Sequence, residues 1–427
     1  ITVQLNPAAV WSDGTPVTSR DVAFTIETLQ TQGAPFYRQA LKDVATTILS
    51  DREIEIRAAT PGDRDFIGRI GRIPIQSSAY WSAGDVAAAT ETPPPGSGPY
   101  LVEDYSINRF IKFRRNPNYW GQDLPVNRGR WNFDEINIQY IRSQDTALEA
   151  FLADDVDFRI ETNAQPVEKH FAQPAVSDGR IQKETRPLDN FGRSVSLIYN
   201  LRRKPFDDIR VRRALALVYP SEFVLNTIFG GAFDPHDGAF GGTVFEAQGR
   251  AADTEWAIIA ASLSDADAGL RETPSPGAAE ASQRERLLRA SELLDEAGLE
   301  VADGRRLNPD GEPWVIDAIY TRPVYDRALS AFANNLERLG IELRYRALEP
   351  ASGAQRLLAK DFDVTLLSWT LSRTPGLAEG LLWGSALADM PRSYALAGVR
   401  DPALDAAITA MQAARDADSQ SRPSARP

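Results

Sequence analysis

The sequence predicts an α/β protein that is divided into two or more lobes. Its 427 residues exceed the roughly 250–300 residues at which a single hydrophobic core stops growing. In the second half of the chain, strand patterns alternate with helix patterns, which is typical of an α/β lobe. A run of prolines and glycines at residues 92–99 indicates a stiff linker and turns between an earlier segment and the next one.

Strand and helix signals follow one another along the first 160 residues. Residues 1–5 alternate like a strand, and residues 18–21 resemble a capping box in front of a helix that carries Val22, Ile26 and Leu29. After the proline run, the pattern turns to short strands that we expect to be neighbours in one sheet. The other elements expected here are strands at residues 53–57, 100–105, 109–114, 136–141 and 156–160 and a helix at residues 146–153.

From residue 194 onwards, cap and stop signals mark the alternation of strands and helices. Gly298 and Gly340 each follow an apolar-periodic run, as glycines at helix C-termini do. Asp207-Asp208 can cap the helix that carries Val211 and Leu215. The expected elements are strands at residues 194–200, 314–320, 341–348 and 363–369, helices after residue 208, at 284–297 and at 329–339, and a surface excursion at 262–282.

Composition and charge exclude several functional classes. The chain has 47 Lys and Arg against 59 Asp and Glu, a net charge of −12, and an acidic surface repels phosphate backbones, so we expect no nucleic-acid partner. No stretch approaches the roughly 18 to 20 apolar residues that cross a bilayer. The chain has no cysteine, and its two histidines, His170 and His236, lack metal-ligand spacing, so we expect no metal and no cofactor.

Paired acidic residues invite a catalytic interpretation, but caps and turns explain them more simply. Asp154-Asp155, Asp207-Asp208 and the pair Asp361 and Asp363 could act as the acid and base of a glycosidase. Carboxylates at helix starts more often accept hydrogen bonds from free backbone N–H groups. Gly96-Ser97-Gly98 also lacks the spacing of a nucleophile elbow. The sequence therefore favours a binding protein, with a saccharide-active hydrolase as the alternative.

Among the eight tryptophans, Trp369 is the strongest candidate for contact with a ligand. Aromatic side chains are usually buried in cores. Trp369, however, ends an apolar strand just before residues 370–376, and ligands of α/β proteins gather at the carboxyl ends of strands. We therefore expect a binding site next to Trp369.

Several motifs resemble those of the peptide/nickel-type (family 5) extracellular solute-binding proteins of ABC importers. The segment W-S-D-G-T-P-V-T-S-R-D-V at residues 11–22 is similar to the family's first landmark, and residues 96–100 and 115–121 are similar to the next two. Residues 124–135 and 205–215 resemble the branch that binds oligopeptides and microcin-type peptides. The resemblance covers nearly the whole chain.

The resemblance implies an α/β, two-lobed periplasmic-binding-protein-like fold, of type II and cluster C-like, with an extra subdomain and incomplete at both termini. It implies that residues 1–95 are part of the extra subdomain and residues 96–192 part of the base lobe. Residues 193–395 would form the second lobe, and residues 396–427 the start of a return to the first lobe with a disordered tail.

The same resemblance implies a non-enzymatic receptor that holds an extended peptide between lobes closing by a hinge. Its partners would be an oligopeptide or peptide-like ligand and the permease subunits of an ABC importer. The protein would act as a monomer in the periplasm, without a cofactor. The alternatives are a saccharide-active hydrolase and a non-functional truncated remnant of the receptor.

The candidate ligand-binding residues surround the end of the strand that carries Trp369. Relatives that bind dipeptides and oligopeptides have an aspartate three residues after this tryptophan, which pairs with the ligand's free amino terminus, whereas this chain has Ser372. A hydroxyl cannot supply that charge-assisted bond, so we expect a ligand whose amino end is blocked or is held elsewhere, for example by Glu379. The candidates are Trp369, Ser372, Arg373, Thr374, Tyr199 and Asn200.

Overall fold

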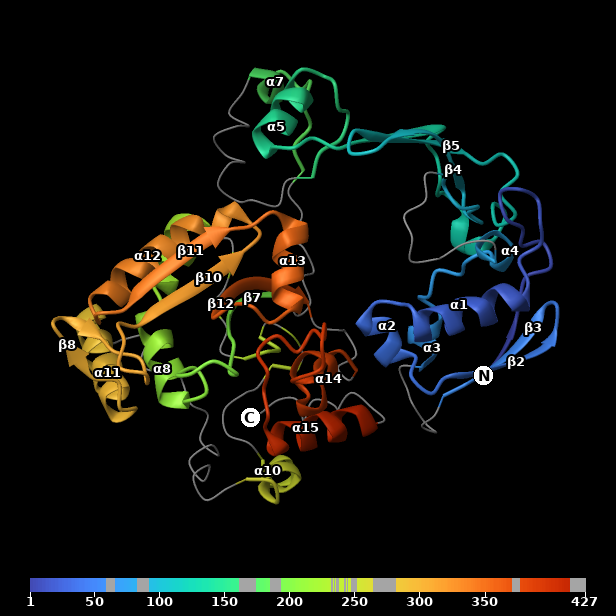
Figure 1. Cartoon of the computed structure of the whole chain (residues 1–427). Helices are drawn as coiled ribbons and strands as arrows, with labels where there is room; N and C mark the ends of the chain where they lie inside the picture. Colours follow the sequence, from blue (N-terminus) through green and yellow to red (C-terminus); the bar gives the residue numbers. More distant parts are fainter. Residues whose placement is uncertain are drawn as a thin grey trace. The chain divides into compact units, whose positions relative to one another are not determined.

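Two compact units make up the chain, residues 1–160 and residues 161–427 (Figure 1). The computed structural model describes residues 1–58, 66–82, 92–160, 174–184, 193–231, 233, 235, 238–241, 243, 245–246, 252–263, 282–370 and 377–414. The domain boundaries expected after residues 95, 192 and 395 remain predictions. Each unit is described by itself.

An antiparallel sheet packed against one helix forms the core at the start of unit 1. Its strands lie in the order β1-β3-β2, and Ile54 and Ile56 of β3 are buried against Val22 and Ile26 of α1. The carboxylate of Asp21 accepts a hydrogen bond from the backbone N–H of Thr18 at 2.7 Å, so the predicted helix start is confirmed. The elements are β1 (Thr2–Gln4), α1 (Ser19–Thr31), α2 (Pro35–Ala40), β2 (Ala45–Ser50), β3 (Glu53–Arg57), α3 (Phe66–Ile70) and α4 (Ser78–Trp81).

The rest of unit 1 contains the second predicted sheet, in the order β4-β5-β6. One face of this sheet is charged, because Lys112 of β5 pairs with Glu103 at 3.2 Å and with Glu135 at 3.3 Å. The apolar side chains Ile111 and Phe113 alternate with these charges and lie on the other face. The elements are β4 (Tyr100–Ser106), β5 (Phe110–Arg115), η1 (Pro125–Asn127), β6 (Glu135–Gln139) and α5 (Gln144–Leu152).

The strand expected at residues 156–160 is wrong. This segment has no strand pairing, and its apolar side chains Phe158 and Ile160 are 75% and 74% exposed. Alternating side chains favour a strand only where a neighbouring strand and a buried face exist, and the segment has neither.

Unit 2 is built on a mixed four-stranded sheet in the order β11-β10-β12-β7. β10 is parallel to β11 and β12, whereas β7 runs antiparallel to β12. The four strands predicted from the sequence in this part are therefore confirmed. They are β7 (Arg193–Tyr199), β10 (Val315–Tyr320), β11 (Glu342–Ala347) and β12 (Val364–Thr370).

Helices cover both faces of this sheet. On one face Leu215 of α8, Leu294 of α11 and Phe332 of α12 are buried together with Ile316 of β10. On the other face Leu357 of α13 packs with Ile319 and Phe362. The helices of the unit are α7 (Pro174–Ser177), α8 (Ile209–Val218), α9 (Ser221–Phe223), the π-helix η2 (Val224–Ile228), α10 (Asp253–Ala260), α11 (Gln283–Glu296), η4 (Pro323–Tyr325), α12 (Asp326–Glu337), α13 (Pro350–Leu358), α14 (Leu377–Trp383), η5 (Ser385–Leu387) and α15 (Pro402–Ala413).

The ends of the predicted helices are set by the expected residues. Asp208 caps α8, accepting a hydrogen bond from the backbone N–H of Arg210 at 2.8 Å. Gly298 and Gly340 follow α11 and α12 with φ angles of +83° and +79°, the left-handed conformation that glycine adopts easily at helix ends. A two-stranded hairpin, β8 (Val301–Ala302) and β9 (Arg305–Arg306), follows α11.

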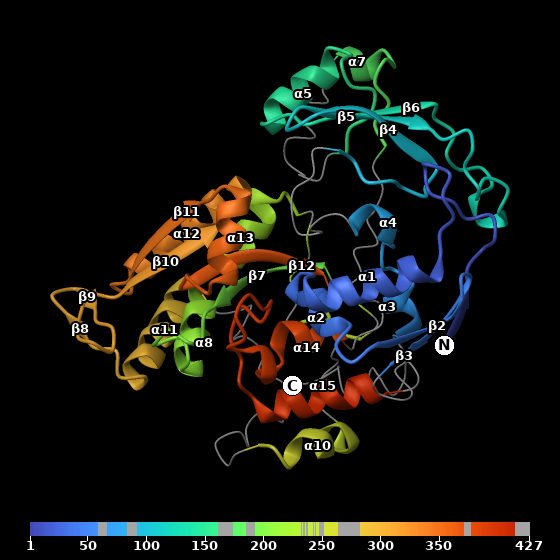
Figure 2. The ribbon, with the colours of Figure 1, turned by 45° about the vertical axis from the view of Figure 1, so that its right-hand side comes forward.

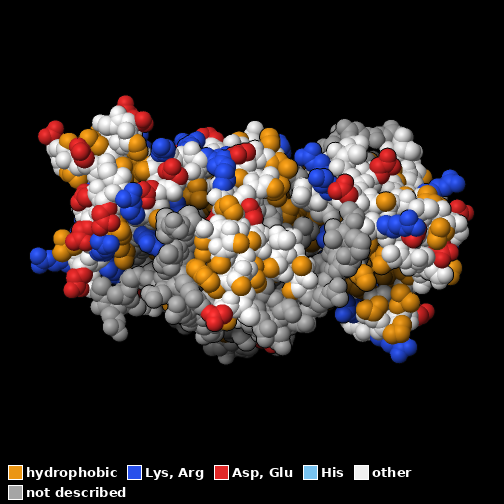
Figure 3. Space-filling view, turned by 90° about the horizontal axis from the view of Figure 1, so that it is seen from below, with side chains coloured by type: hydrophobic (Ala, Val, Ile, Leu, Met, Phe, Trp, Pro, Cys, Tyr) orange, Lys and Arg blue, Asp and Glu red, His pale blue; other side chains and the backbone are white. Residues whose placement is uncertain are grey.

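The surface of unit 2 differs between its two ends. Figure 3 shows acidic and basic side chains interspersed where α11 lies, and there Arg289 pairs with Glu292 at 2.9 Å and with Glu296 at 3.2 Å. Hydrophobic side chains gather where α10 and α15 lie side by side (Figures 1, 2 and 3). Most of the predicted excursion at residues 262–282 lies outside the described residues, and so do residues 415–427 of the segment 396–427 in which a disordered tail is expected.

Candidate functional site

Trp369 lies near the carboxyl end of β12, on the face of the sheet that α13 covers. Val364 and Leu366 of β12 belong to the core with α8, α11 and α12, and alternation along the strand directs Trp369 to the opposite face. Its indole Nε1 donates a hydrogen bond to Ser196 Oγ on β7 at 3.1 Å. This bond holds the indole against the neighbouring strand.

An aromatic cluster surrounds Trp369. The ring of Trp383 on α14 meets Trp369 edge to face, with centroids 5.3 Å apart and an interplanar angle of 87°, a favourable arrangement for two aromatic rings. Both tryptophans are half-buried and pack against the buried side chains of Phe240, Phe245 and Met411. We call these five residues the tryptophan cluster. Their side chains offer flat apolar surface and no acid or base, which suits binding rather than acid–base chemistry.

Three predicted site residues, Ser372, Arg373 and Thr374, lie outside the described residues. The chain is described again from α14 onwards. On α14, Glu379 is 1% exposed and lies one helical turn before Trp383, so a carboxylate is positioned on the helix that contributes to the tryptophan cluster. We did not predict Trp383 as a site residue; the one signal for it was its place in the family-like sequence Trp383-Gly384-Ser385.

Tyr199 and Asn200 are not brought together with Trp369. In the ladder of β7 and β12, Tyr199 is paired with Val364 and Ser194 with Trp369. Five residues along a strand span about 17 Å, so Asn200 lies at the far end of the ladder. Tyr199 also faces the other side of the sheet, where its ring stacks on Phe206 with centroids 5.7 Å apart. Burial in this core raises the pKa of Tyr199.

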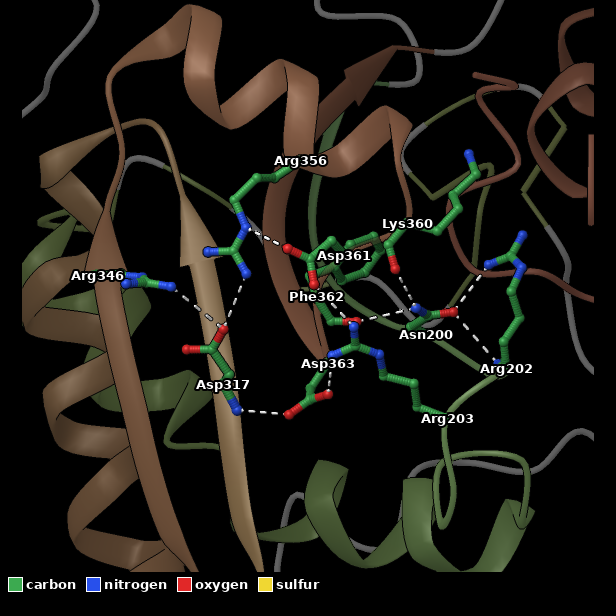
Figure 4. A network of polar contacts seen from close by, with 10 residues as sticks. All are labelled: Asn200, Arg202, Arg203, Asp317, Arg346, Arg356, Lys360, Asp361, Phe362 and Asp363. Atoms are coloured by element: carbon green, nitrogen blue, oxygen red, sulfur yellow. Dashed lines mark hydrogen bonds and ion pairs between the residues drawn. The ribbon is translucent and has the colours of Figure 1, made fainter. Parts of the chain in front are cut away.

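Asn200 is 1% exposed, and its amide is fully hydrogen-bonded inside the protein (Figure 4). Its Nδ2 donates to the carbonyl oxygens of Lys360 and Phe362, both at 3.0 Å. Its Oδ1 accepts from Arg202, from the backbone N–H at 3.4 Å and from Nη1 at 2.9 Å. An amide offers two donors and two acceptor positions, so these contacts use all four. They give Asn200 a structural role, and its predicted ligand contact remains untested.

The acidic pair Asp361 and Asp363 is held by arginines in the same network (Figure 4). Arg203 donates to Asp363 Oδ1 at 2.7 Å and to Asp361 Oδ1 at 3.1 Å, and Arg356 donates to Asp361 at 2.9 Å. Hydrogen bonding from Arg356 lowers the pKa of Asp361, and Arg203 adds to the effect. A general acid needs a raised pKa, so Asp361 is arranged as a structural anion. Asp363 also accepts from the backbone N–H of Asp317 at 2.8 Å.

Arg202 ties the same region to the segment after α14. Its guanidinium donates to the carbonyl oxygens of Leu396 and Ala395, each at 2.9 Å, and to that of Ala388. Gly398 makes room for it, because a Cβ at this position would lie 2.5 Å from the guanidinium carbon. Together, Asn200, Arg202 and Arg203 join the end of β7 to the start of β12 and to residues 388–396.

The described parts of the chain show neither a candidate metal site nor a helix that could span a membrane. Among these residues, no group of histidine and carboxylate side chains could hold a metal ion. Within the same ranges, no helix combines the length and the apolar character that crossing a membrane requires.

Sequence comparison places the chain among known binding proteins. Residues 1–384 match the family model described as "Bacterial extracellular solute-binding proteins, family 5 Middle". The chain is 34% identical over 418 residues to a protein of Brucella suis named "Putative binding protein", covering 96% of this chain and 68% of that protein. It is 30% identical over 438 residues to the "Probable peptide-binding protein YejA" of Agrobacterium fabrum, covering 98% of this chain and 70% of that protein.

Structural comparison confirms the predicted fold class. The chain is similar to the crystal structure of a mannohexaose-bound periplasmic oligopeptide-binding protein of an ABC transporter from Thermotoga maritima. The TM-score is 0.75, and the match covers 99% of this chain and 76% of the other. Because sequence identity is 18%, this likeness establishes the two-lobed α/β periplasmic-binding-protein fold alone.

Proposed function

The chain belongs to the bacterial extracellular solute-binding proteins of family 5, and we propose that the solute it binds is a peptide. The observation that carries this proposal is the 30% identity, across 98% of the chain, to a relative named as a peptide-binding protein. The tryptophan cluster supports it, since indole rings can pack on side chains of many shapes. Broad tolerance of peptide sequence is the expected result.

The bound peptide would be delivered to the permease subunits of an ABC importer. The Thermotoga maritima protein of the same fold is described as part of an oligopeptide ABC transporter and as periplasmic, which supports the same partner and the same compartment for this chain. We propose that it acts as a monomer and that peptide is released to the permease unchanged. The arginine pairing of Asp361 and Asp363 supports a role without catalysis.

An oligosaccharide is the second candidate ligand. The structure from Thermotoga maritima contains mannohexaose, and sugar rings pack on indole faces as peptide side chains do. A receptor for either ligand would leave it intact, whereas the hydrolase considered from the sequence would shorten the sugar. Mass analysis of the candidate ligands after incubation distinguishes a peptide receptor, an oligosaccharide receptor and a hydrolase.

The replacement of an aspartate by Ser372 leads us to propose that the preferred peptides have a blocked amino end. A free amino terminus carries a positive charge that a hydroxyl cannot neutralise. Glu379 of α14 is a carboxylate that could accept such a charge, but it is 1% exposed. Pairs of free and N-formylated peptides of the same sequence test this, and tighter binding of the free form would contradict it.

Native mass spectrometry of the purified chain is the test of the proposed function. We expect a stoichiometric mass shift with a mixture of peptides three to eight residues long, roughly the range that an extended strand-like ligand spans, and a weaker shift with mannohexaose. A shift with mannohexaose alone would replace peptide by saccharide as the ligand. A folded chain that binds neither would contradict the proposal.

Variants of Trp369 test whether the tryptophan cluster is the binding site. We expect Trp369→Ala to weaken peptide binding by about tenfold or more, because burying one large aromatic ring contributes roughly 1.5–3 kcal/mol. Ser196→Ala is the matched control, since it removes the hydrogen bond at 3.1 Å and leaves the ring in place, so its effect should be smaller. Isothermal titration calorimetry measures both, and equal affinities for all three proteins would contradict this location.

A further inference from the structure

A segment of irregular backbone, residues 388–398, follows α14 and η5 and leads to α15. We call this segment the strap. It forms neither helix nor strand, so its backbone carbonyl groups need hydrogen-bond donors from other parts of the protein. Ala388, Ala395 and Leu396 of the strap are buried, and protein groups must therefore take the place of water there.

Arg202, which follows β7, donates hydrogen bonds to three of these carbonyl groups. Its Nη1 donates to the carbonyl oxygen of Leu396 and its Nη2 to that of Ala395, each at 2.9 Å. Nη2 also donates to the carbonyl oxygen of Ala388. The guanidinium is itself held in place, because Nη1 donates to Oδ1 of the buried Asn200 at 2.9 Å (Figure 4).

Two further contacts connect the strap to the rest of unit 2. Lys360 Nζ donates to the carbonyl oxygen of Ser393, and the backbone N–H of Leu201 donates to that of Ala397 at 2.8 Å. Each of these donors reaches one point of the strap. Arg202 binds the strap near both of its ends through one rigid, planar group, so it fixes the path of the strap as well as its attachment.

The strap in turn packs against α14. Leu381 of α14 is buried with Leu387 and with Ala395 of the strap. Leu381 and Trp383 are two residues apart, which is about 200° around the helix axis, so they face in roughly opposite directions. Trp383 meets the ring of Trp369 on its own side. Helix α14 therefore lies between the strap and Trp369.

Helix α15 also contacts α14, but it fixes a different relationship. A Cβ on Gly380 of α14 would lie 3.1 Å from Gln412 Nε2 of α15, so the two helices approach closely there. The carboxylate of Asp405 on α15 accepts a hydrogen bond from the backbone N–H of Ser385 at 2.9 Å. These contacts fix α14 relative to α15, whereas Arg202 and the strap fix α14 relative to β7.

Both tryptophans of the edge-to-face pair are thus anchored to β7. Trp369 is anchored directly, through its hydrogen bond to Ser196 Oγ, and Trp383 is anchored through Leu381, the strap and Arg202. A binding site needs such support, because its groups must be held to within about 0.5 Å of the productive geometry.

We propose that Arg202 is a positioning residue for the peptide site: by holding the strap, it sets the place of Trp383 beside Trp369. This inference rests on the proposed function, in which the tryptophan cluster binds peptide. Arg202 acts without touching the ligand, since its donors go to Asn200 and to the strap.

Fluorine NMR of the full chain labelled with 5-fluorotryptophan tests the positioning without any ligand. Trp383→Phe and Trp11→Phe identify the resonances of these two residues among the eight tryptophans. We expect Arg202→Met to shift the Trp383 resonance and to leave that of Trp11, in a core of unit 1, unchanged. Arg202→Lys keeps the charge but loses the planar fork, so it should shift the Trp383 resonance by less. Urea denaturation shows that each variant is folded.

Titration calorimetry with Ala-Phe-Ala and its N-formylated form measures the consequence for binding. We expect Arg202→Met to weaken binding of the preferred peptide about tenfold and Arg202→Lys to weaken it by less. Arg203→Met is the matched control, because the adjacent Arg203 pairs with Asp361 and Asp363 and not with the strap. It should change neither the Trp383 resonance nor the affinity.

The two measurements separate this inference from the proposed function. An unchanged Trp383 resonance in folded Arg202→Met would overturn the positioning role, and so would an equal shift in Arg203→Met. Undiminished peptide affinity in Arg202→Met would overturn it as well. A shifted Trp383 resonance in Arg202→Met, together with a wild-type chain that binds neither peptide, would support the positioning of Trp383 and count against the peptide as ligand.

Discussion

Arg306 is a charged residue that is almost completely enclosed by acceptors. It is 1% exposed, and its guanidinium donates to the carbonyl oxygens of Leu339 at 3.2 Å and Leu299 at 2.7 Å. It also donates to Asp295 at 2.8 Å and to Ser291 Oγ at 3.0 Å. One side chain thus connects β9 with α11 and with the end of α12.

Replacing Arg306 should therefore be among the costlier single changes in unit 2. We expect Arg306→Met to lower the free energy of unfolding by roughly 2–4 kcal/mol, because it leaves buried acceptors without donors. Urea denaturation measures the loss. Arg305→Met, at the adjacent exposed position, is the control and should change stability by less than about 0.5 kcal/mol. Equal losses of unfolding free energy in the two variants would show that the buried hydrogen bonds of Arg306 do not stabilise the fold.

Lys360 makes part of the stability depend on alkaline pH. Burial, together with the nearby charge of Arg202, lowers the pKa of Lys360 to about 8. Its Nζ donates a hydrogen bond to the carbonyl oxygen of Ser393. Between pH 8 and the unfolded value of 10.5, the unfolded chain binds more protons than the folded one. The free energy of unfolding therefore rises with pH through this window, as far as this group contributes.

We expect Lys360→Met to remove this contribution. The wild-type protein should gain stability relative to the variant when urea unfolding is measured at pH 7.5 and again at pH 10. Lys42→Met, an exposed position in unit 1, controls for the loss of an ordinary lysine. Parallel pH profiles for the wild-type protein and Lys360→Met would contradict the lowered pKa.

At the scale of the elements, α11 shows how strongly a helix start can be specified locally. Ser282 Oγ accepts a hydrogen bond from the backbone N–H of Glu285 at 3.3 Å, and the Glu285 carboxylate accepts one from the backbone N–H of Ser282 at 2.8 Å. Ser282→Ala should lower the free energy of unfolding by about 1 kcal/mol. Ser352→Ala is the control in thermal unfolding, because Glu349 and not Ser352 caps α13; equal losses would contradict the capping role.

Most strands and long helices could be predicted because their signals are local. The glycines after α11 and α12 and the cap of α8 each depend on a few neighbouring residues. The strand expected at residues 156–160 failed because pairing depends on a distant partner, which alternation cannot reveal. Helix α13 was not predicted, although its apolar residues gather on one face and Leu357 is buried.

The candidate site was predictable only in part. Trp369 could be chosen because it ends an apolar strand, but its contact with Trp383 on α14 depends on tertiary packing. Asn200 looked like a polar group at a strand end, yet its partners Lys360 and Phe362 lie 160 and 162 residues away in sequence. The face of the sheet on which the Tyr199 side chain lies depends on the register of β7 with β12, and the sequence of one strand does not determine that register.

At the scale of the whole molecule, the two units have separate cores. Ile54 belongs to the core of unit 1, and the hydrogen bonds of Arg306 lie entirely in unit 2. We expect calorimetry to show that Ile54→Ala, which should cost roughly 2–5 kcal/mol, lowers the transition of unit 1, whereas Arg306→Met lowers that of unit 2. The double variant should show both shifts added together. A single transition shifted alike by both variants would contradict independent cores.

The antiparallel pairing of β7 with β12 determines when, during translation, the sheet of unit 2 can be completed. Tyr199 is paired with Val364, so a ribosome must add 165 further residues before the first rung of that ladder can form. At bacterial synthesis rates of roughly 5–20 residues per second, the nascent β7 waits about 10–30 s without its partner. An unpaired strand attracts other chains during that time. Synthesis therefore leaves β7 without its partner until β12, the last strand among the described residues, has been made.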